Sequence, residues 1–267
     1  MIDSAQALSH AIAAAKLAGT IILSGLDNEL KIADKGSSNN LVTHIDTACE
    51  TAITQYIATQ YPGHDFLGEE ASYQSQGSDW LWIIDPLDGT TNFIKGIRYF
   101  SVSIALAHRP SQKIVAGVVY NPVSGELFKA HAGGGAWLEQ VGKSDIRLKP
   151  SANTQLDGSL FVTGFYYDRG AAMRRTLAQI GALMEAGAMD IRRFGSAALD
   201  LCLVAAGRVE GFWEHVLNPW DFAAAWLICQ EAGVKVSDGD GKPLGFVPSM
   251  VIAAPPAIHP ILAGFLV

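Results

Sequence analysis

The segment WIIDPLDGTTNF, Trp82 to Phe93, places two carboxylates three residues apart at the end of an apolar run. The unbroken apolar stretch 80–84 predicts a buried strand of a layered α/β structure. Pro86 is expected to stop ladder pairing, and the Asp-Gly pair that follows it to turn the chain. We therefore expect Asp85 and Asp88 to point into one crevice at the edge of a sheet.

Two carboxylates in one crevice repel each other, which raises the pKa of one of them unless a cation neutralises the charge. Oxygen ligands of this kind suit a hard divalent ion, so Asp85 and Asp88 are candidate metal ligands. Thr90, Thr91 and Asn92 suit the start of a helix, whose free N–H groups could hold a phosphate. The alternative interpretation is that Asp-Pro-Leu-Asp-Gly is only a turn with solvated acids.

Two further acidic sites lie in equally apolar surroundings. Within 66–72, a short apolar segment ends in a glycine and the paired acids Glu69 and Glu70. The stretch 218–225 puts Asp221 at the start of an apolar helix. Asp221 alone is interpreted as a helix cap, because Asp accepts hydrogen bonds from free N–H groups at that end. Only a fold that brings residue 221 beside the earlier acids makes it a metal ligand.

The composition indicates a compact soluble protein. With 267 residues, 49% of them hydrophobic and 17% charged, the chain can bury a large core in one domain or in two closely packed halves. The formal net charge is −7 and no basic run is present, which argues against a nucleic-acid-binding surface.

The remaining sequence features indicate no membrane span and no zinc site. The apolar stretch 11–23 has the spacing of an amphipathic packing helix, and five breaks by proline or histidine interrupt the apolar stretch 247–267. Cys49, Cys202 and Cys229 have no C-x-x-C spacing and lie in helical patterns. Reduced core thiols and a cytoplasmic location are therefore expected.

Periodicity predicts two N-terminal helices, a strand-rich middle and alternating helices and strands after about residue 169. The second helix covers 43–61, and a terminal strand and a short helix end the chain. Gly133 to Gly135 are expected to form a tight hairpin link. The other expected elements are strands at 80–85, 99–108, 113–120, 126–130 and 210–214, and helices at 196–206 and 221–232.

Three separated motifs agree in their order and spacing. They are GEE at 68–70, WIIDPLDGTTNF at 82–93 and PWDFAAAW at 219–226. They are accompanied by Lys35, the stretch 40–46, the segment 195–198, and Glu214 seven residues before Asp221. In this combination nearly the whole chain resembles the inositol monophosphatase family of metal-dependent phosphatases. The segments NFIKG and GSAALDLCLVAAGRVEGFWE are most similar to the corresponding segments of bacterial members.

The resemblance implies an α/β (α+β) fold, a layered αβαβα sandwich of the inositol monophosphatase and fructose-1,6-bisphosphatase type. Residues 1–145 would form an N-terminal half with an antiparallel sheet and most of the metal ligands. Residues 146–267 would form a C-terminal α/β half that supplies Asp221 and the substrate contacts, with no separate linker.

The resemblance also implies the cofactor and the reaction. Glu69, Asp85 and the carbonyl oxygen of Leu87 would hold one Mg²⁺, and Asp85, Asp88 and Asp221 a second. Glu69 would also support a third, weaker ion, and Li⁺ would inhibit by replacing Mg²⁺.

By the same resemblance, Thr90, with Asp46 behind it, would orient and deprotonate a metal-bound water for in-line attack on the phosphate. Glu69 would share in this catalytic role, and no covalent phosphoenzyme is needed.

The substrate contacts follow from the same resemblance. Phosphate would be bound by the backbone N–H groups of Gly89 and Thr90. Sugar or cyclitol hydroxyls would be bound by Ser196, Ala197 and Glu214. Lys35, in the loop-like stretch 35–40, would close over the site. The alternatives are a solvated strand-end acid for Glu214 and a surface lysine for Lys35.

Departures from the family pattern bear on the substrate. Asn40 stands where many relatives have aspartate, and Ser196 where the animal enzymes have threonine. Neither is expected to touch the metals. The Thr91-Asn92 pair favours the inositol monophosphatase branch over the nucleotide 3′-phosphatase branch. Histidinol phosphate and fructose 1,6-bisphosphate stay open as substrates.

A function of a different class stays open beside hydrolysis of inositol 1-phosphate. Some bacterial relatives act through contacts with the transcription machinery, so the chain could be a protein-binding factor whose phosphatase activity is incidental. The family implies a homodimer. We expect a small phosphomonoester as the ligand, with no direct contact to nucleic acid or membrane.

Overall fold

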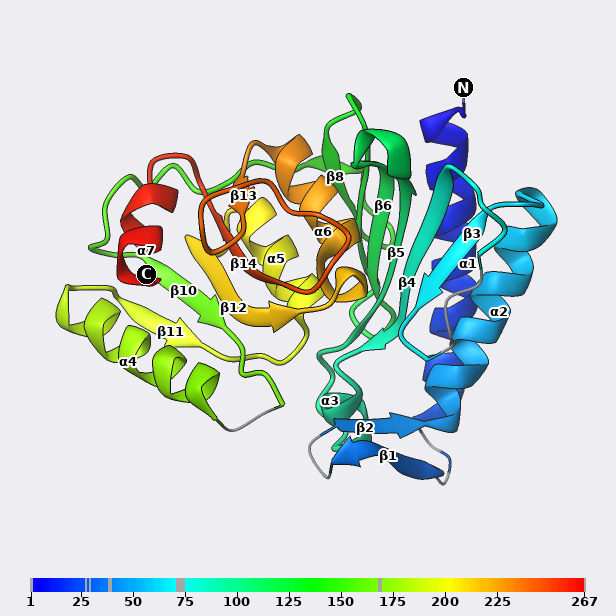
Figure 1. Ribbon diagram of the computed structural model, residues 1–267, viewed down its shortest axis with the longest axis horizontal. Coiled ribbons are helices and arrows are strands. Elements are labelled where there is room, and N and C mark those ends of the chain that lie inside the picture. The colour runs from blue at the N-terminus through cyan, green and yellow to red at the C-terminus, as the bar shows by residue number, and fades with distance from the viewer. Residues whose placement is uncertain are drawn as a thin grey trace.

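Five layers of secondary structure build the molecule, in the order αβαβα (Figure 1). The computed structural model describes residues 2–26, 28, 30–37, 40–70, 75–167 and 170–266, and the side chains of 34–37 and 40 lie outside this description. A pair of N-terminal helices covers one face of the larger sheet, a second pair fills the space between the sheets, and a third covers the smaller sheet. The predicted layered sandwich is confirmed.

The first layer contains α1 (Ser4–Gly25) and α2 (His44–Gln60). Asp3 caps α1 by accepting the N–H groups of the next turn, and Thr43 and Asp46 form a capping box at the start of α2. By length and composition α1 could cross a membrane, but 44% of its most apolar 18-residue stretch is buried inside the molecule. Its alanine-rich face packs on α2 and on the larger sheet.

Among the described residues, the larger sheet has seven strands, in which β3 pairs parallel to β4 and the other neighbours are antiparallel. The predicted antiparallel sheet is thus confirmed except at its β3 edge. Its order is β3 (Asp65–Gly68), β4 (Trp80–Asp88), β5 (Ser101–His108), β6 (Lys113–Asn121), β7 (Glu126–His131), β8 (Ala136–Glu139) and β9 (Ile146–Arg147). The glycines 133–135 link β7 to β8, as predicted.

Side chains of β4 alternate between the two faces of this sheet, as the period of two requires. Trp82 and Ile84 enter the core beneath α1 and α2, whereas Leu81 and Ile83 enter the core on the opposite face. Both faces are covered, which explains why the run reads as continuously apolar.

The prediction that Pro86 ends ladder pairing is wrong. Strand β4 continues to Asp88, which pairs with Ser101, while Asp85 pairs with Ser103. Three steps along β4 therefore face two steps along β5, so one extra residue forms a bulge. Pro86 is tolerated inside the bulge, where no ladder donor is needed.

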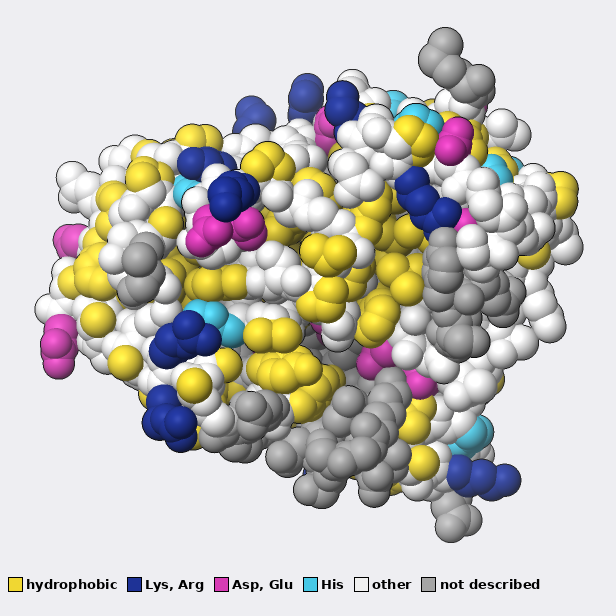
Figure 2. All heavy atoms as spheres, viewed as in Figure 1, with side chains coloured by type: hydrophobic (Ala, Val, Ile, Leu, Met, Phe, Trp, Pro, Cys, Tyr) yellow, Lys and Arg dark blue, Asp and Glu magenta, His cyan; other side chains and the backbone are white. Residues whose placement is uncertain are grey.

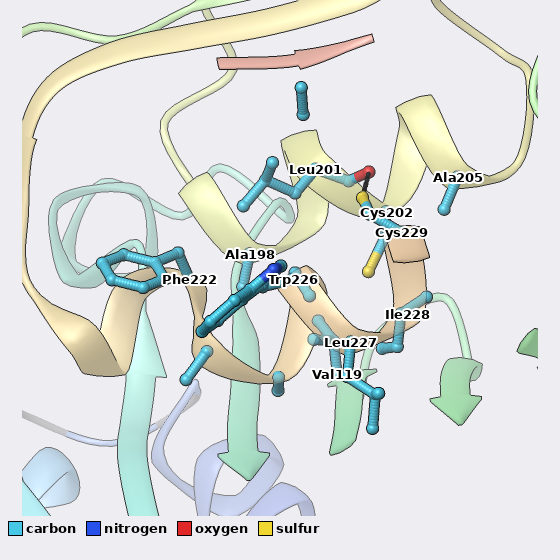
Figure 3. Close-up of a cluster of buried hydrophobic side chains, with 14 of the residues drawn as sticks. Val119, Ala198, Leu201, Cys202, Ala205, Phe222, Trp226, Leu227, Ile228 and Cys229 are labelled. Carbon is cyan, nitrogen blue, oxygen red and sulfur yellow. Dashed lines mark hydrogen bonds between the residues drawn. The ribbon is translucent and has the colours of Figure 1, made fainter. Parts of the chain in front are cut away.

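The central layer contains α5 (Ala197–Ala205) and α6 (Pro219–Ala232). Small residues let α6 approach the larger sheet closely: a β-carbon at Gly117 would lie 2.8 Å from the carbonyl oxygen of Ala224. Figure 3 shows the packing between the two helices, where the sulfur of Cys229 faces the carbonyl oxygen of Leu201 at 3.3 Å. The three cysteines are free, buried and helical, as expected.

The smaller sheet mixes parallel and antiparallel pairs, and α4 (Ala171–Glu185) and α7 (His259–Leu266) cover its outer face. Its order is β11 (Asp190–Arg192), β10 (Leu160–Thr163), β12 (Gly211–Leu217), β14 (Ser249–Ala254) and β13 (Lys235–Ser237). The division of the chain at residue 145 stays a prediction; β9 still pairs within the larger sheet.

Three short elements complete the fold. They are the hairpin β1 (Ile32–Ser37) and β2 (Asn40–Thr43), the helix α3 (Thr90–Ile94) and a 3₁₀ turn at Arg109–Ser111. The loop predicted at 35–40 is wrong as far as Ser37, because β1 extends to that residue. The Lys35 side chain, and with it the proposed contact to the site, lies outside the described residues.

Candidate active site

The bulged end of β4 brings its two acids to one place. Asp85 and Asp88 are 1% and 8% exposed, and an oxygen of Asp85 accepts the N–H of Leu87 at 3.0 Å. Gly89 follows with a φ of 96° and starts α3. A side chain could not fit at this glycine without strain, because it also lies close to the backbone of residues 99 and 195.

Asp88 joins the half of the molecule built on the larger sheet to the half built on α5, α6 and the smaller sheet. Its carboxylate accepts hydrogen bonds from the Ser196 hydroxyl at 2.5 Å and from the N–H groups of Ala198 at 2.9 Å and Ala197 at 3.3 Å. The acid therefore caps the N-terminus of α5, where negative charge is favourable. That Ser196 does not touch the metals stays a prediction, but its hydroxyl contacts the proposed metal ligand Asp88 directly.

Thr90 and Asp46 form the contact that the family resemblance implies. The Thr90 hydroxyl lies 2.9 Å from a carboxylate oxygen of Asp46 and 3.1 Å from the carbonyl oxygen of Leu87. The other oxygen of Asp46 accepts the N–H of Thr43 at 2.9 Å and its hydroxyl at 2.5 Å. Because Asp46 is fully buried, this network fixes the Thr90 hydroxyl.

Asp221 is the third residue of α6 rather than its cap. Asn218 is the N-cap, and Asp221 accepts the Asn218 N–H at 2.7 Å. The two interpretations of Asp221 are compatible, because the same carboxylate serves the capping box and faces the cavity that Asp88 also lines.

Electrostatics show that the four acids are neighbours. Burial raises the pKa of Asp85 well above its usual range, and three nearby carboxylates raise it further. Those carboxylates belong to Glu69, Asp88 and Asp221. Burial likewise raises the pKa of Asp221, and it raises the pKa of Asp88 to about 6 against the opposing bonds from α5.

A cavity of about 100 Å³ adjoins this acidic group, at the meeting point of the two halves. On the face shown in Figure 2, acidic side chains appear beside the hollow between these halves. The lining residues are Asp88, Gly89, Thr90, Thr91, Gly164, Phe165, Tyr166, Tyr167, Arg193, Gly195, Ser196, Ala197, Asp200, Glu214, Val216, Leu217, Asn218 and Asp221.

Glu214 reaches the cavity from a bulged end of β12. Burial raises the pKa of its carboxyl to about 8, with Arg193 acting in the opposite direction. The carboxylate occupies the space that a side chain at Gly164 would need. Glu214 therefore reaches the cavity because residue 164 is a glycine.

The structure adds residues that sequence reasoning missed. Asp200 is 2% exposed and accepts the Tyr99 hydroxyl at 2.7 Å, and Arg193 lines the cavity beside Gly195. Desolvation and the four clustered acids raise the pKa of the Tyr167 phenol, and this residue lines the cavity although it is 44% exposed. Asp200 lies inside the quoted segment GSAALDLCLVAAGRVEGFWE, at the start of an apolar helix, so a signal for it was present in the sequence.

The donor set fits magnesium in kind. All candidate ligands are oxygens, Mg²⁺ needs only one or two carboxylates, and a cation would relieve the mutual repulsion that raises the pKa of Asp85. Within the described residues, no three acidic, histidine or cysteine side chains form a closed group around an ion position. Asp88 and Asp221 are instead held by α5 and by the α6 cap.

Comparison with known proteins identifies the family of this chain. The model of the inositol monophosphatase family matches residues 3–266. The chain belongs to the inositol monophosphatase family. The bacterial assignment within that family agrees with a protein from Pasteurella multocida named Nus factor SuhB. It is 42% identical over 254 residues, which cover 94% of this chain and 92% of that protein.

Solved structures of the family have the same fold. Extragenic suppressor protein SuhB from Bartonella henselae superposes with a TM-score of 0.89 at 37% identity, covering 98% of each chain. An inositol monophosphatase from Anabaena (Nostoc) sp. PCC 7120 gives 0.84 at 36% identity, covering 98% of this chain and 95% of that one.

Magnesium occurs in the inositol monophosphatase family. A structure described as IMPase/NADP phosphatase complexed with Mg²⁺ and phosphate is 25% identical to this chain, with a TM-score of 0.80. The match covers 94% of this chain and 91% of that one.

Proposed function

We propose that the chain is a magnesium-dependent phosphomonoesterase that hydrolyses inositol 1-phosphate and related polyol phosphates. The observation that carries this proposal is that Asp88 and Asp221, from distant segments, line one cavity with Thr90, and that Glu69 and Asp85 interact electrostatically with these acids. Bound Mg²⁺ would supply an acidified water and neutralise the phosphate charge, with the four acids and the Leu87 carbonyl as its ligands.

The chain itself supplies the orientation of the attacking water. A hydroxyl donates one proton, and that of Thr90 is directed to Asp46 at 2.9 Å or to Leu87 at 3.1 Å. The oxygen of Thr90 is then left as an acceptor for a proton of the water. As the Thr90 oxygen accepts that proton, its own hydroxyl proton can pass to the Asp46 carboxylate, which Thr43 fixes on its other side.

Substrate recognition is divided between the two halves. Gly89 and Thr90 begin α3, and the first N–H groups of a helix have no partner within it, so they can bind phosphate oxygens. Glu214 faces the same cavity from the other half and can accept hydrogen bonds from the hydroxyl groups of a polyol. Ser196 and Ala197 act through Asp88, whose orientation they fix.

The direct test is phosphate release from inositol 1-phosphate, histidinol phosphate, fructose 1,6-bisphosphate and 3′-phosphoadenosine 5′-phosphate, each with Mg²⁺ and with EDTA. The expected result is preferential phosphate release from inositol 1-phosphate. This release is lost in EDTA and inhibited by Li⁺. Preference for histidinol phosphate or another ester would retain the mechanism and change the substrate. Absence of metal-dependent release from all four would overturn the phosphatase assignment.

A second function is favoured by the names of the relatives. The similar curated proteins, including those of Pasteurella multocida and Escherichia coli K12, are named Nus factor SuhB, which points to the transcription machinery rather than to an inositol phosphate. We therefore also propose a protein-binding role in transcription, in the cytoplasm. This role has more direct support from the relatives than inositol specificity has.

The two functions can be separated by one variant. Asp88→Asn removes a proposed metal ligand at a buried position, so it should not alter the outer surface. If the binding role holds, immobilised wild type and Asp88→Asn recover RNA polymerase from bacterial lysate equally well. Recovery of no polymerase by either protein would contradict this role. Light scattering on the same preparations tests the homodimer that the family implies.

A further inference from the structure

Helix α2 carries two buried acids one turn apart. Asp46 is fully buried and Glu50 is 4% exposed. Residues four apart lie on the same face of a helix, so both carboxylates face the larger sheet, near the end of β4 that carries Asp85 and Asp88. Asp46 contacts Thr90, whereas Glu50 contacts the segment that carries Glu69.

Glu50 holds the backbone after Glu69 through a hydrogen bond. Its carboxylate accepts the N–H of Glu70 at 2.9 Å. The bond joins the middle of α2 to the residue that follows the proposed ligand. A buried carboxylate that accepts a backbone N–H restricts that peptide more than a solvated one could, because no water can replace it.

Glu50 also fixes the backbone before Glu69 by contact. A β-carbon at Gly68 would overlap the Glu50 carboxylate and would lie 2.6 Å from its Oε1. Gly68 ends the extended strand β3 and has no positive φ, so its backbone does not require glycine. What requires glycine at this position is the space that Glu50 occupies.

Resting on the proposed function, we propose that Glu50 is a positioning residue that fixes the peptides on both sides of Glu69 and so directs the Glu69 carboxylate toward Asp85 and Asp221. The electrostatics agree with this direction. After burial, the charge of Glu69 raises the pKa of both Asp85 and Asp221, which indicates that its carboxylate lies near them. Glu50 acts on the backbone that flanks Glu69, through the hydrogen bond from Glu70 and the close contact with Gly68.

Asp46 and Glu50 thus give α2 two separate tasks. The first orients the Thr90 hydroxyl, and the second orients the GEE segment. Loss of Asp46 should act on turnover, whereas loss of Glu50 should act on the affinity for magnesium. Partners that orient a metal ligand from behind typically change metal affinity by about 10- to 100-fold when removed.

The test measures Mg²⁺ binding by calorimetry and amide exchange of the segment 66–70 by mass spectrometry, both independent of turnover. Glu50→Ala should weaken Mg²⁺ binding by about tenfold or more and speed exchange at Glu70. Glu50→Gln keeps an acceptor oxygen of the same reach, so it should restore slow exchange and most of the affinity. Gly68→Ala should displace the Glu50 carboxylate and weaken Mg²⁺ binding in the same direction.

Gln179→Ala is the matched control for loss of a buried polar side chain. Gln179 accepts the indole N–H of Trp213 and donates to the carbonyl of Leu266, in the other half of the molecule. This variant should lower stability without changing Mg²⁺ affinity or exchange at 66–70. An equal change in Gln179→Ala and Glu50→Ala would mean a general loss of stability and would overturn the positioning role.

The remaining outcomes are also decisive. Wild-type affinity together with wild-type exchange in Glu50→Ala overturns the proposal even if turnover falls. If the wild type neither binds Mg²⁺ nor releases phosphate, the proposed function fails by itself. Exchange at Glu70 in Glu50→Ala and Gly68→Ala then still decides whether Glu50 holds this segment. If Glu50→Ala does not fold, Gly68→Ala and Glu50→Gln carry the comparison.

Discussion

The hydroxyl of Ser196 lies 2.5 Å from a carboxylate oxygen of Asp88, across 108 positions of sequence. The contact joins the end of β4 in one half to the start of α5 in the other. An acid proposed to bind metal is therefore also the cap of a helix. Changes at Asp88 should consequently affect both stability and turnover.

Asp88→Asn should reduce phosphate release by a factor on the order of 100, because it removes an anionic ligand of the proposed Mg²⁺. It should also lower stability by about 1–3 kcal/mol, since an amide NH₂ would replace either the oxygen that accepts from Ser196 and Ala198 or the oxygen that accepts from Ala197. Steady-state kinetics and thermal unfolding measure the two effects. Asp240→Asn, at an exposed acid, is the control. Unchanged kcat in Asp88→Asn would count against the site.

Thr90→Val should abolish most turnover while keeping the shape of the side chain. The hydroxyl that faces Asp46 disappears, and the loss expected for a group that orients and accepts protons is about 100-fold or more. Thr90→Ser retains the hydroxyl and should recover activity. Single-turnover phosphate release separates this effect from substrate binding. Equal activity of the valine and serine variants would exclude a role for the hydroxyl.

Gly164→Ala should raise KM for a polyol phosphate with little change in kcat. The added methyl group needs the space of the Glu214 carboxylate, so that carboxylate must move out of its place at the cavity. Loss of one good hydrogen bond to substrate corresponds to about tenfold in KM. Gly181→Ala is the matched control, because a β-carbon at this helical position meets no atom within 4 Å. The prediction fails if both alanine variants have the same KM.

Without divalent metal, the protein should become less stable as pH rises from 6.5 to 8. Burial raises the pKa of Glu214 from 4.5 to about 8, so the folded state holds this proton more tightly than the unfolded state does. A raised carboxyl pKa stabilises at low pH, and the contribution is lost as pH passes through the folded value.

The predicted range begins at pH 6.5, because burial lowers the pKa of His259 from 6.5 to about 4. At lower pH this group makes stability rise with pH and so opposes the effect of Glu214. Saturating Mg²⁺ should flatten the dependence, since metal binds the ionised carboxylates. Thermal unfolding in EDTA and in Mg²⁺ measures both curves, and Glu214→Gln should lose part of the slope. A metal-free protein that gains stability from pH 6.5 to 8 would contradict the assignment.

Local pattern was enough to predict many of the longer elements. The helix expected at 43–61 is α2 at 44–60, and the strands expected at 113–120 and 126–130 are found within one residue at their ends. These predictions succeed because the alternation of apolar and polar residues follows the face that each element buries. The bulge at Pro86 was missed because it depends on how β4 pairs with β5 rather than on β4 alone.

The candidate site was predictable in part, and for a different reason in each part. Asp85 and Asp88 could be identified from their strand-to-turn context, whereas the pairing of Thr90 with Asp46 came from the family resemblance alone. Glu50 and Tyr167 were not found, because neither lies in a motif. Their importance depends on neighbours that are distant in sequence, such as Gly68 for Glu50 and the clustered acids that raise the pKa of Tyr167.

The amino-acid order determined which residues could bind a hard cation and where each stood within its own strand or helix, because these properties depend on side-chain chemistry and short-range periodicity. It did not determine that Glu69, Asp85, Asp88 and Asp221 would meet. Their meeting depends on burial of the shared core between the two sheets, which draws α5 and α6 against the larger sheet. The acids are held together, against their mutual repulsion, by that packing and by the hydrogen bonds from α5 and the α6 cap.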